Sequence, residues 1–84
     1  MAARKHNLKH RYGITVEEYE QMEKEQKGVC KICKKKPKGH LHVDHSHKTK
    51  KVRGLLCGCC NRGIGLLQED PQIFLNSLEY LRAA

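Results

Sequence analysis

The chain has 84 residues, of which 38% are hydrophobic and 31% are charged, with no tryptophan. We expect a single domain, and a domain this small buries too little apolar surface to be stable without cross-links or a metal. No segment approaches the roughly 18 apolar residues of a membrane span, and the N-terminus lacks the apolar core of a signal peptide. We therefore expect a cytoplasmic protein with no membrane partner.

The formal net charge of +8 is unevenly distributed. Residues 27–62 contain 11 of the 17 lysines and arginines but only one acid, Asp44, whereas five glutamates lie between residues 17 and 25. A concentrated basic surface favours a polyanionic partner, with nucleic acid ahead of an acidic membrane because no basic amphipathic helix is evident. A solvated basic face is the alternative, so charge alone does not establish function.

The first predicted helix has clear end signals. Thr15 and Glu18 are spaced as a capping box, and Ile14 and Tyr19 as a hydrophobic staple, so the helix should begin at about residue 16. It should end at about Gly28, since glycine commonly terminates helices.

Two Cys-x-x-Cys pairs, Cys30 with Cys33 and Cys57 with Cys60, are separated by 23 residues. In a reducing compartment this pattern indicates a metal site rather than disulfides. Structural zinc takes thiolates at about 2.3 Å, and two short-spaced pairs preorganise the tetrahedron. A set that includes Cys59, or a histidine ligand, is an alternative, but the matched spacing favours the two pairs. We expect Cys59 to be a small packing residue.

Between the cysteine pairs the hydrophobic period changes to two. In residues 40–45, Leu41 and Val43 share one face and Asp44 lies on the other, which predicts a half-buried strand. Residues 52–56 predict a second strand, and the six residues between the strands favour a hairpin.

The C-terminal part is predicted to be helical over residues 61–68, and again after Asp70, which suits an N-cap before proline. Phe74, Leu78 and Leu81 form an amphipathic stripe, which we interpret as core or as a dimer contact. A homodimer is therefore a hypothesis.

Asp44 requires its own explanation. It is surrounded by histidines and stands at the end of a strand, and its hairpin leads into the second cysteine pair, followed directly by Asn61 at a helix start. An isolated Asp-His pair is usually just solvated. The combination with Asn61 favours a catalytic site.

These motifs resemble the HNH endonucleases with a ββα-metal fold, and within them the recombination endonuclease VII type of phage origin. The resemblance covers nearly the whole chain. It is carried by Tyr12-Gly-Ile-Thr15, both cysteine pairs, His42-Val-Asp-His45 with His47, and Arg53-Gly-Leu-Leu-Cys57-Gly-Cys-Cys-Asn61-Arg followed by Gly65-Leu-Leu67.

The resemblance implies an α+β fold, a small zinc-stabilised ββα-metal (His-Me finger) nuclease domain with flanking N- and C-terminal helices. The single domain would span residues 1–84. Its expected parts are a basic arm at 1–13, a helix at 14–28, a zinc-braced ββα core at 29–69 and a helix at 70–84.

The resemblance further implies that Asp44 and Asn61 bind a catalytic divalent cation and that His45 is the general base that activates water. Carboxylate and amide oxygens suit Mg²⁺ or Mn²⁺, although zinc or nickel could also occupy the site. No further carboxylate follows Asn61 closely, so we expect the metal to be held weakly. His47 matches a family position that supports catalysis, with plain exposure as the alternative.

Adjacent residues on a regular strand point to opposite faces, which would separate Asp44 from His45. We therefore expect the strand to be distorted at this end. DNA is the expected partner, through phosphate contacts. The candidate nucleic-acid contacts are Arg53, Arg62, Lys48, Lys50 and Lys51.

The main alternative is a non-catalytic zinc-containing module that binds nucleic acid. Such a module would keep the cysteines and lysines, but it has no need of Asp44, His45 and Asn61 together. A protein-binding adaptor leaves the charge asymmetry unexplained. If the nuclease interpretation holds, loss of zinc should abolish activity even with these three residues intact, because the second cysteine pair lies directly between the hairpin and Asn61.

Overall fold

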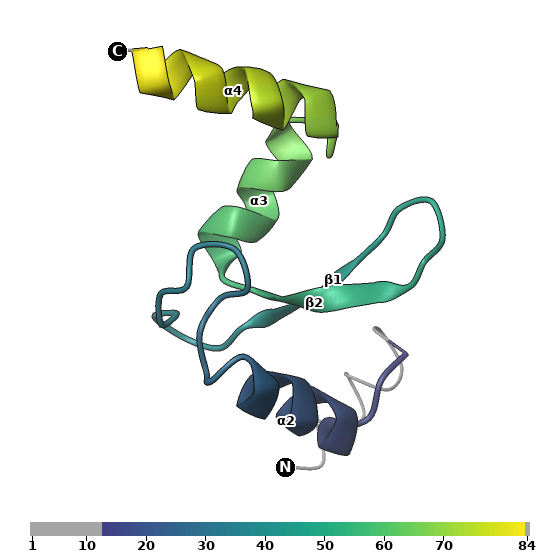
Figure 1. Ribbon diagram of the computed structural model, residues 1–84. Helices are drawn as coiled ribbons and strands as arrows, with labels where there is room; N and C mark the ends of the chain where they lie inside the picture. The colour runs from purple at the N-terminus through teal and green to yellow at the C-terminus, as the bar shows by residue number, and fades with distance from the viewer. Residues whose placement is uncertain (1–12, 84) are drawn as a thin grey trace.

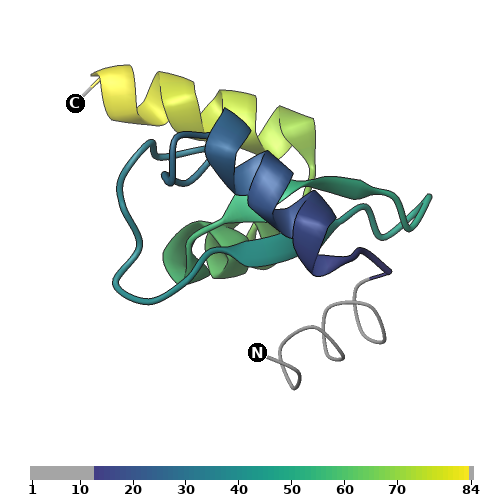
Figure 2. The same ribbon diagram turned by 90° about the horizontal axis from the view of Figure 1, so that it is seen from below.

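The computed structural model describes residues 13–83, so the predicted basic arm lies almost entirely outside the described residues. The elements in chain order are α2 (Val16–Glu25), β1 (His42–His45), β2 (Val52–Leu56), α3 (Gly58–Leu66) and α4 (Pro71–Ala83). Helix α2 packs across the hairpin, α3 leaves from the end of β2, and α4 extends from the far end of α3 (Figure 1, Figure 2). The predicted small α+β fold, with two antiparallel strands followed by a helix, is confirmed.

Helix α2 begins as its sequence signals predict. The Glu18 amide donates to Thr15 Oγ1 at 3.0 Å, and the Thr15 amide donates to Glu18 Oε1 at 2.8 Å, completing the capping box. Ile14 and Tyr19 are both buried, as expected of a hydrophobic staple. The helix ends at Glu25, earlier than predicted, and the left-handed Gly28, with a φ of 73°, donates its amide to the Glu23 carbonyl beyond that end.

The core lies between α2 and the hairpin. The Tyr19 hydroxyl donates to the Leu41 carbonyl at 2.6 Å, which joins α2 to the segment that enters β1. The Gln26 side chain accepts from the Leu55 amide and donates to the Leu55 carbonyl, each at 3.0 Å, so it pairs with β2 as a neighbouring strand would. The buried apolar residues are Ile14, Tyr19, Cys30, Leu41, Val43, Leu55 and Leu56.

The hairpin carries an irregularity where the site is expected. Asp44 is opposite Gly54, but His45 is opposite Val52, so Arg53 is an extra residue in β2. Such a β-bulge bends its strand and redirects neighbouring side chains. The predicted distortion at Asp44 and His45 is therefore confirmed, although the extra residue belongs to the opposite strand.

Helix α3 begins at Gly58, three residues earlier than expected. The reason is that Cys57 acts as its N-cap: Cys57 Sγ accepts from the Cys60 amide at 3.4 Å. The start of α3 is thus part of the cysteine motif, and Asn61 lies in the first turns of the helix.

Helix α4 is capped as predicted, since Asp70 Oδ1 accepts from the Gln72 amide at 2.9 Å. However, no residue of α4 is buried: in the apolar stripe, Leu78 and Leu81 are exposed and Phe74 is only half-buried. The core interpretation of its apolar stripe is therefore wrong, because α4 extends beyond the hairpin rather than covering it (Figure 1). The dimer contact stays a prediction.

Within residues 13–83, no helix combines the length and the apolar character needed to cross a membrane.

Candidate metal and catalytic site

The four predicted zinc ligands converge. The sulfur atoms of Cys30, Cys33, Cys57 and Cys60 all lie within 4.8 Å of one another, and those of Cys33 and Cys57 are 3.9 Å apart. Thiolates at about 2.3 Å from a tetrahedral zinc ion are about 3.8 Å from each other, so the cluster is compact enough to hold such an ion after small side-chain shifts. The sulfur atoms come from the turn after α2 and from the start of α3, and the cluster therefore joins these two segments.

The cluster distributes protons unequally among its thiols. Burial raises the pKa of Cys30, but hydrogen bonds from the backbone at Cys57, Cys33 and Ile32 outweigh it and lower the pKa from 9.0 to about 6. Burial, together with hydrogen bonds to the neighbouring thiols, raises the pKa of Cys60 to about 12. The Cys30 thiolate is thus favoured before any metal binds, whereas Cys60 needs a bound cation to be held deprotonated.

Cys59 lies outside the cluster and is exposed. Its sulfur is 3.7 Å from Arg62 Nη2. The predicted packing role of Cys59 is therefore wrong, because one residue along a helix turns the side chain by about 100° away from the direction of Cys60.

The four predicted catalytic residues meet at one place. Asp44, His45, His47 and Asn61 border a single surface hollow, whose other walls are Val43, Ser46 and Lys50. Asp44 and His45 reach the same hollow because the bulge interrupts the strand alternation between them. Asn61 approaches from α3, directly after Cys60.

Asp44 is largely buried, and both of its carboxylate oxygens are occupied. Arg53 Nε donates to Oδ2 at 2.7 Å, and Arg53 Nη2 donates to Oδ1 at 3.1 Å. This bidentate pair raises the pKa of Arg53 above its ordinary value. Arg53 is the bulged residue of β2, so the same irregularity supplies the partner of Asp44.

The sequence patterns miss one member of this group, Glu69. Its Oε1 is 2.8 Å from Arg53 Nη2, and its Oε2 is 2.9 Å from His47 Nδ1. Glu69 follows α3 and belongs to no motif. The signal that could have identified it is that it is the first acid after Asp44 in a strongly basic stretch.

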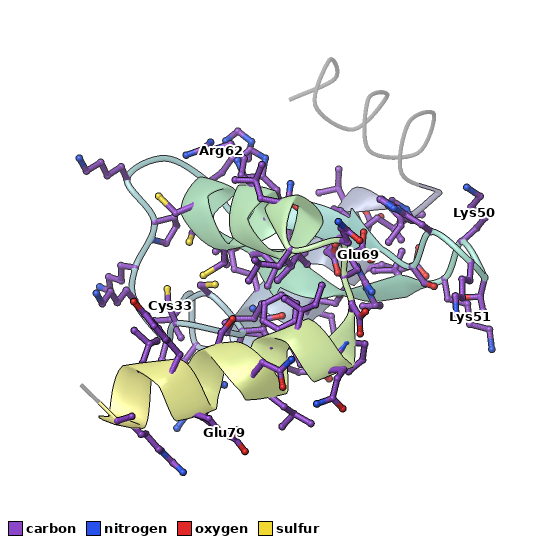
Figure 3. All side chains as sticks on the ribbon, turned by 90° about the horizontal axis from the view of Figure 1, so that it is seen from above. Cys33, Lys50, Lys51, Arg62, Glu69 and Glu79 are labelled. Atoms are coloured by element: carbon purple, nitrogen blue, oxygen red, sulfur yellow. The ribbon has the colours of Figure 1, made fainter. Side chains whose placement is uncertain are left out.

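The remaining predicted contacts lie in two different places. Lys48, Lys50 and Lys51 are exposed in the hairpin loop, and Lys50 also borders the hollow (Figure 3). Arg62 does not border it. Arg62 lines a separate basic hollow beside the cysteine cluster. The other basic residues of this hollow are His40, His42 and three lysines of the loop that precedes β1.

The hairpin, the helix that follows it and the four cysteines arranged to bind a metal ion define a small α+β protein with a charged site beside the hairpin. Residues 5–83 match the model of the recombination endonuclease VII family. The chain belongs to this family.

Two curated relatives are similar to the chain, and both are called gene 59 protein. That of Mycobacterium phage L5 is 45% identical over 73 residues, which cover 83% of this chain and 44% of the relative. That of Mycobacterium phage D29 is 43% identical over 74 residues, which cover 84% of this chain and 45% of the relative. The chain thus spans less than half the length of these relatives. No solved structure matches it significantly.

Proposed function

We propose that the chain is the nuclease domain of an HNH-type DNA endonuclease that hydrolyses phosphodiester bonds with the help of a divalent metal ion. The observation that carries the proposal is that Asp44, His45 and Asn61 border one hollow in a member of the recombination endonuclease VII family. A non-catalytic module would not require a carboxylate, an imidazole and an amide at the same place.

In this proposal the cysteine cluster holds one structural zinc ion. Cys57 caps α3, and Cys60 directly precedes Asn61. The ion therefore fixes the start of α3 relative to the hairpin, and with it the position of Asn61 relative to Asp44.

Asp44 and Asn61 are the proposed ligands of the catalytic cation, Mg²⁺ or Mn²⁺, because their oxygens match the preference of hard cations. When bound, the cation supplies Lewis acidity at the phosphate and stabilises the leaving oxygen. Arg53 donates to both oxygens of Asp44, so a cation that approaches this carboxylate competes with the guanidinium for it.

His45 is the proposed general base. Its imidazole takes a proton from the water whose oxygen forms a bond to phosphorus, while the bond from phosphorus to the 3′ oxygen breaks and that oxygen gains a proton from solvent. The proposed contacts to neighbouring phosphates are Lys50, which borders the hollow, and Lys48 and Lys51, which are exposed on the same loop. Such contacts favour DNA without strong sequence preference.

The test is incubation of supercoiled plasmid with zinc-loaded protein and Mg²⁺ or Mn²⁺, with an EDTA control. We expect metal-dependent cleavage that His45→Ala slows by at least about a hundredfold, the usual contribution of a general base. His40→Ala is the matched control, because His40 lines the separate basic hollow.

Cleavage by His45→Ala at the wild-type rate would remove His45 as the base. If no divalent metal supports cleavage while DNA binding persists, the non-catalytic zinc-containing module becomes the better description of the chain.

A further inference from the structure

Glu69 connects the hairpin to the segment after α3 through two ion pairs. It contacts Arg53 with one carboxylate oxygen and His47 with the other, and its side chain is only 18% exposed. Figure 3 shows it between the end of α3 and the hairpin. Both of its partners come from the segment that carries Asp44 and His45.

The backbone at this point is in an unfavourable conformation. Gln68 and Glu69 have φ values of 61° and 52°, so two consecutive residues other than glycine are left-handed. Such conformations persist where surrounding contacts enforce them, and they are concentrated at functional sites. Here the left-handed pair follows the end of α3 at Leu66, and the Glu69 carboxylate reaches the hairpin.

We infer, building on the proposed function, that Glu69 is a positioning residue that retains Arg53 and His47 beside the site when Asp44 binds a divalent cation.

Arg53 donates to both oxygens of Asp44, and a cation that ligates this carboxylate competes with the guanidinium, because the two positive charges repel each other at the same group. Arg53 Nη2 is already 2.8 Å from Glu69 Oε1, so the guanidinium keeps a carboxylate partner when it gives up Asp44. Without the charge of Glu69, Asp44 would be the only carboxylate partner of Arg53 among these contacts, and metal binding at Asp44 would weaken that ion pair. Glu69 therefore makes the exchange of Arg53 for a metal ion at Asp44 easier.

The guanidinium that Glu69 retains can then contact DNA. Once it is displaced from Asp44, it stays beside the hollow as a positive charge whose N–H groups can donate to a phosphate. On the other side, His47 Nδ1 is 2.9 Å from Glu69 Oε2, and this contact directs Nε2, on the opposite side of the ring, away from Glu69. One carboxylate thus orients two groups that can meet the DNA backbone.

The direct test is the affinity of zinc-loaded protein for Mn²⁺, measured from free Mn²⁺ by electron paramagnetic resonance. We expect Glu69→Gln to weaken Mn²⁺ binding by about three- to tenfold, and Arg53→Gln to tighten it. In the double variant, the effect of Glu69→Gln should fall below about twofold, because a double-mutant cycle isolates the part that acts through Arg53. Glu79→Gln on α4 is the matched control, since it removes the same charge from an exposed position (Figure 3), and it should leave the affinity unchanged.

Two results would overturn the inference. One is a Glu69→Gln variant that unfolds at a lower temperature but binds Mn²⁺ normally, which would make the role of Glu69 merely structural. The other is an equal loss of affinity in the single and the double variant, which would show a direct charge effect that bypasses Arg53.

Asp44→Asn separates the inference from the proposed function. If it abolishes Mn²⁺ binding while Glu69→Gln has no effect, the inference alone fails. If Asp44→Asn binds Mn²⁺ as tightly as the wild type, the proposed metal site fails and the inference fails with it.

Discussion

The cysteine cluster and the charged site beside the hairpin are assembled in different ways. The cluster joins two short turns, and each turn fixes the distance between its own two sulfurs. The charged site collects Asp44 from β1, Arg53 from the bulge in β2, Asn61 from α3 and Glu69 from beyond α3. Each half of the cysteine cluster can therefore be encoded by local spacing, whereas the charged site exists only after the hairpin and α3 have packed against each other.

Helix α3 links the two regions. Its N-cap Cys57 and Cys60 in its first turn belong to the cysteine cluster, and the segment after its last residue carries Glu69. Nine residues of helix span about 13 Å, so a small rotation at the cluster would displace Glu69 and Asn61 together. The cluster should therefore dominate stability, and the charged site should dominate activity.

The largest effect is expected from breaking the cluster. Cys60→Ser should abolish zinc binding and leave the chain largely unfolded, because structural zinc sites in small domains contribute about 10 kcal/mol or more of folding free energy. Zinc content and circular dichroism measure this. Cys59→Ser is the control, since Cys59 is exposed and outside the cluster, and it should bind one zinc ion and fold normally.

Breaking the charged site should have a smaller effect on folding. Arg53→Gln leaves the largely buried Asp44 carboxylate without its bidentate partner, and we expect a loss of about 1 to 3 kcal/mol in the free energy of unfolding. Chemical denaturation of the zinc-loaded protein measures it. A loss as large as that of Cys60→Ser would contradict the distinction between the two regions.

The smallest effect is expected in the core that supports both regions. Tyr19→Phe removes the hydroxyl that donates to the Leu41 carbonyl, and it should lower the free energy of unfolding by about 1 kcal/mol. In a domain of this size that corresponds to a fall of about 4 to 8 °C in the midpoint of thermal unfolding. Zinc stoichiometry should not change, which separates this variant from those in the cluster.

The features that the sequence predicts correctly depend on neighbouring residues. The capping box at Thr15, the cap at Asp70, the six-residue hairpin loop and the cysteine pairs are each defined within a few positions. Spacing alone is sufficient for them, because the contacting groups are joined by a short stretch of chain.

The features that the sequence does not reveal depend on tertiary contacts. Distortion near Asp44 is predictable from strand alternation, but its location at Arg53 depends on the pairing of β1 with β2. Glu69 reaches the site only through the left-handed turn after α3, and nothing in its neighbours signals that turn. For α4, the apolar stripe predicts burial, but the direction in which α3 leaves the hairpin decides where that stripe faces.

The central claim is that one zinc ion in the cysteine cluster organises the catalytic half of the molecule. The most direct measurement is plasmid cleavage at fixed Mg²⁺ while zinc is titrated into metal-stripped protein. We predict no cleavage without zinc and a rate that reaches its plateau at one zinc ion per chain. Full cleavage by the zinc-free protein would contradict the claim.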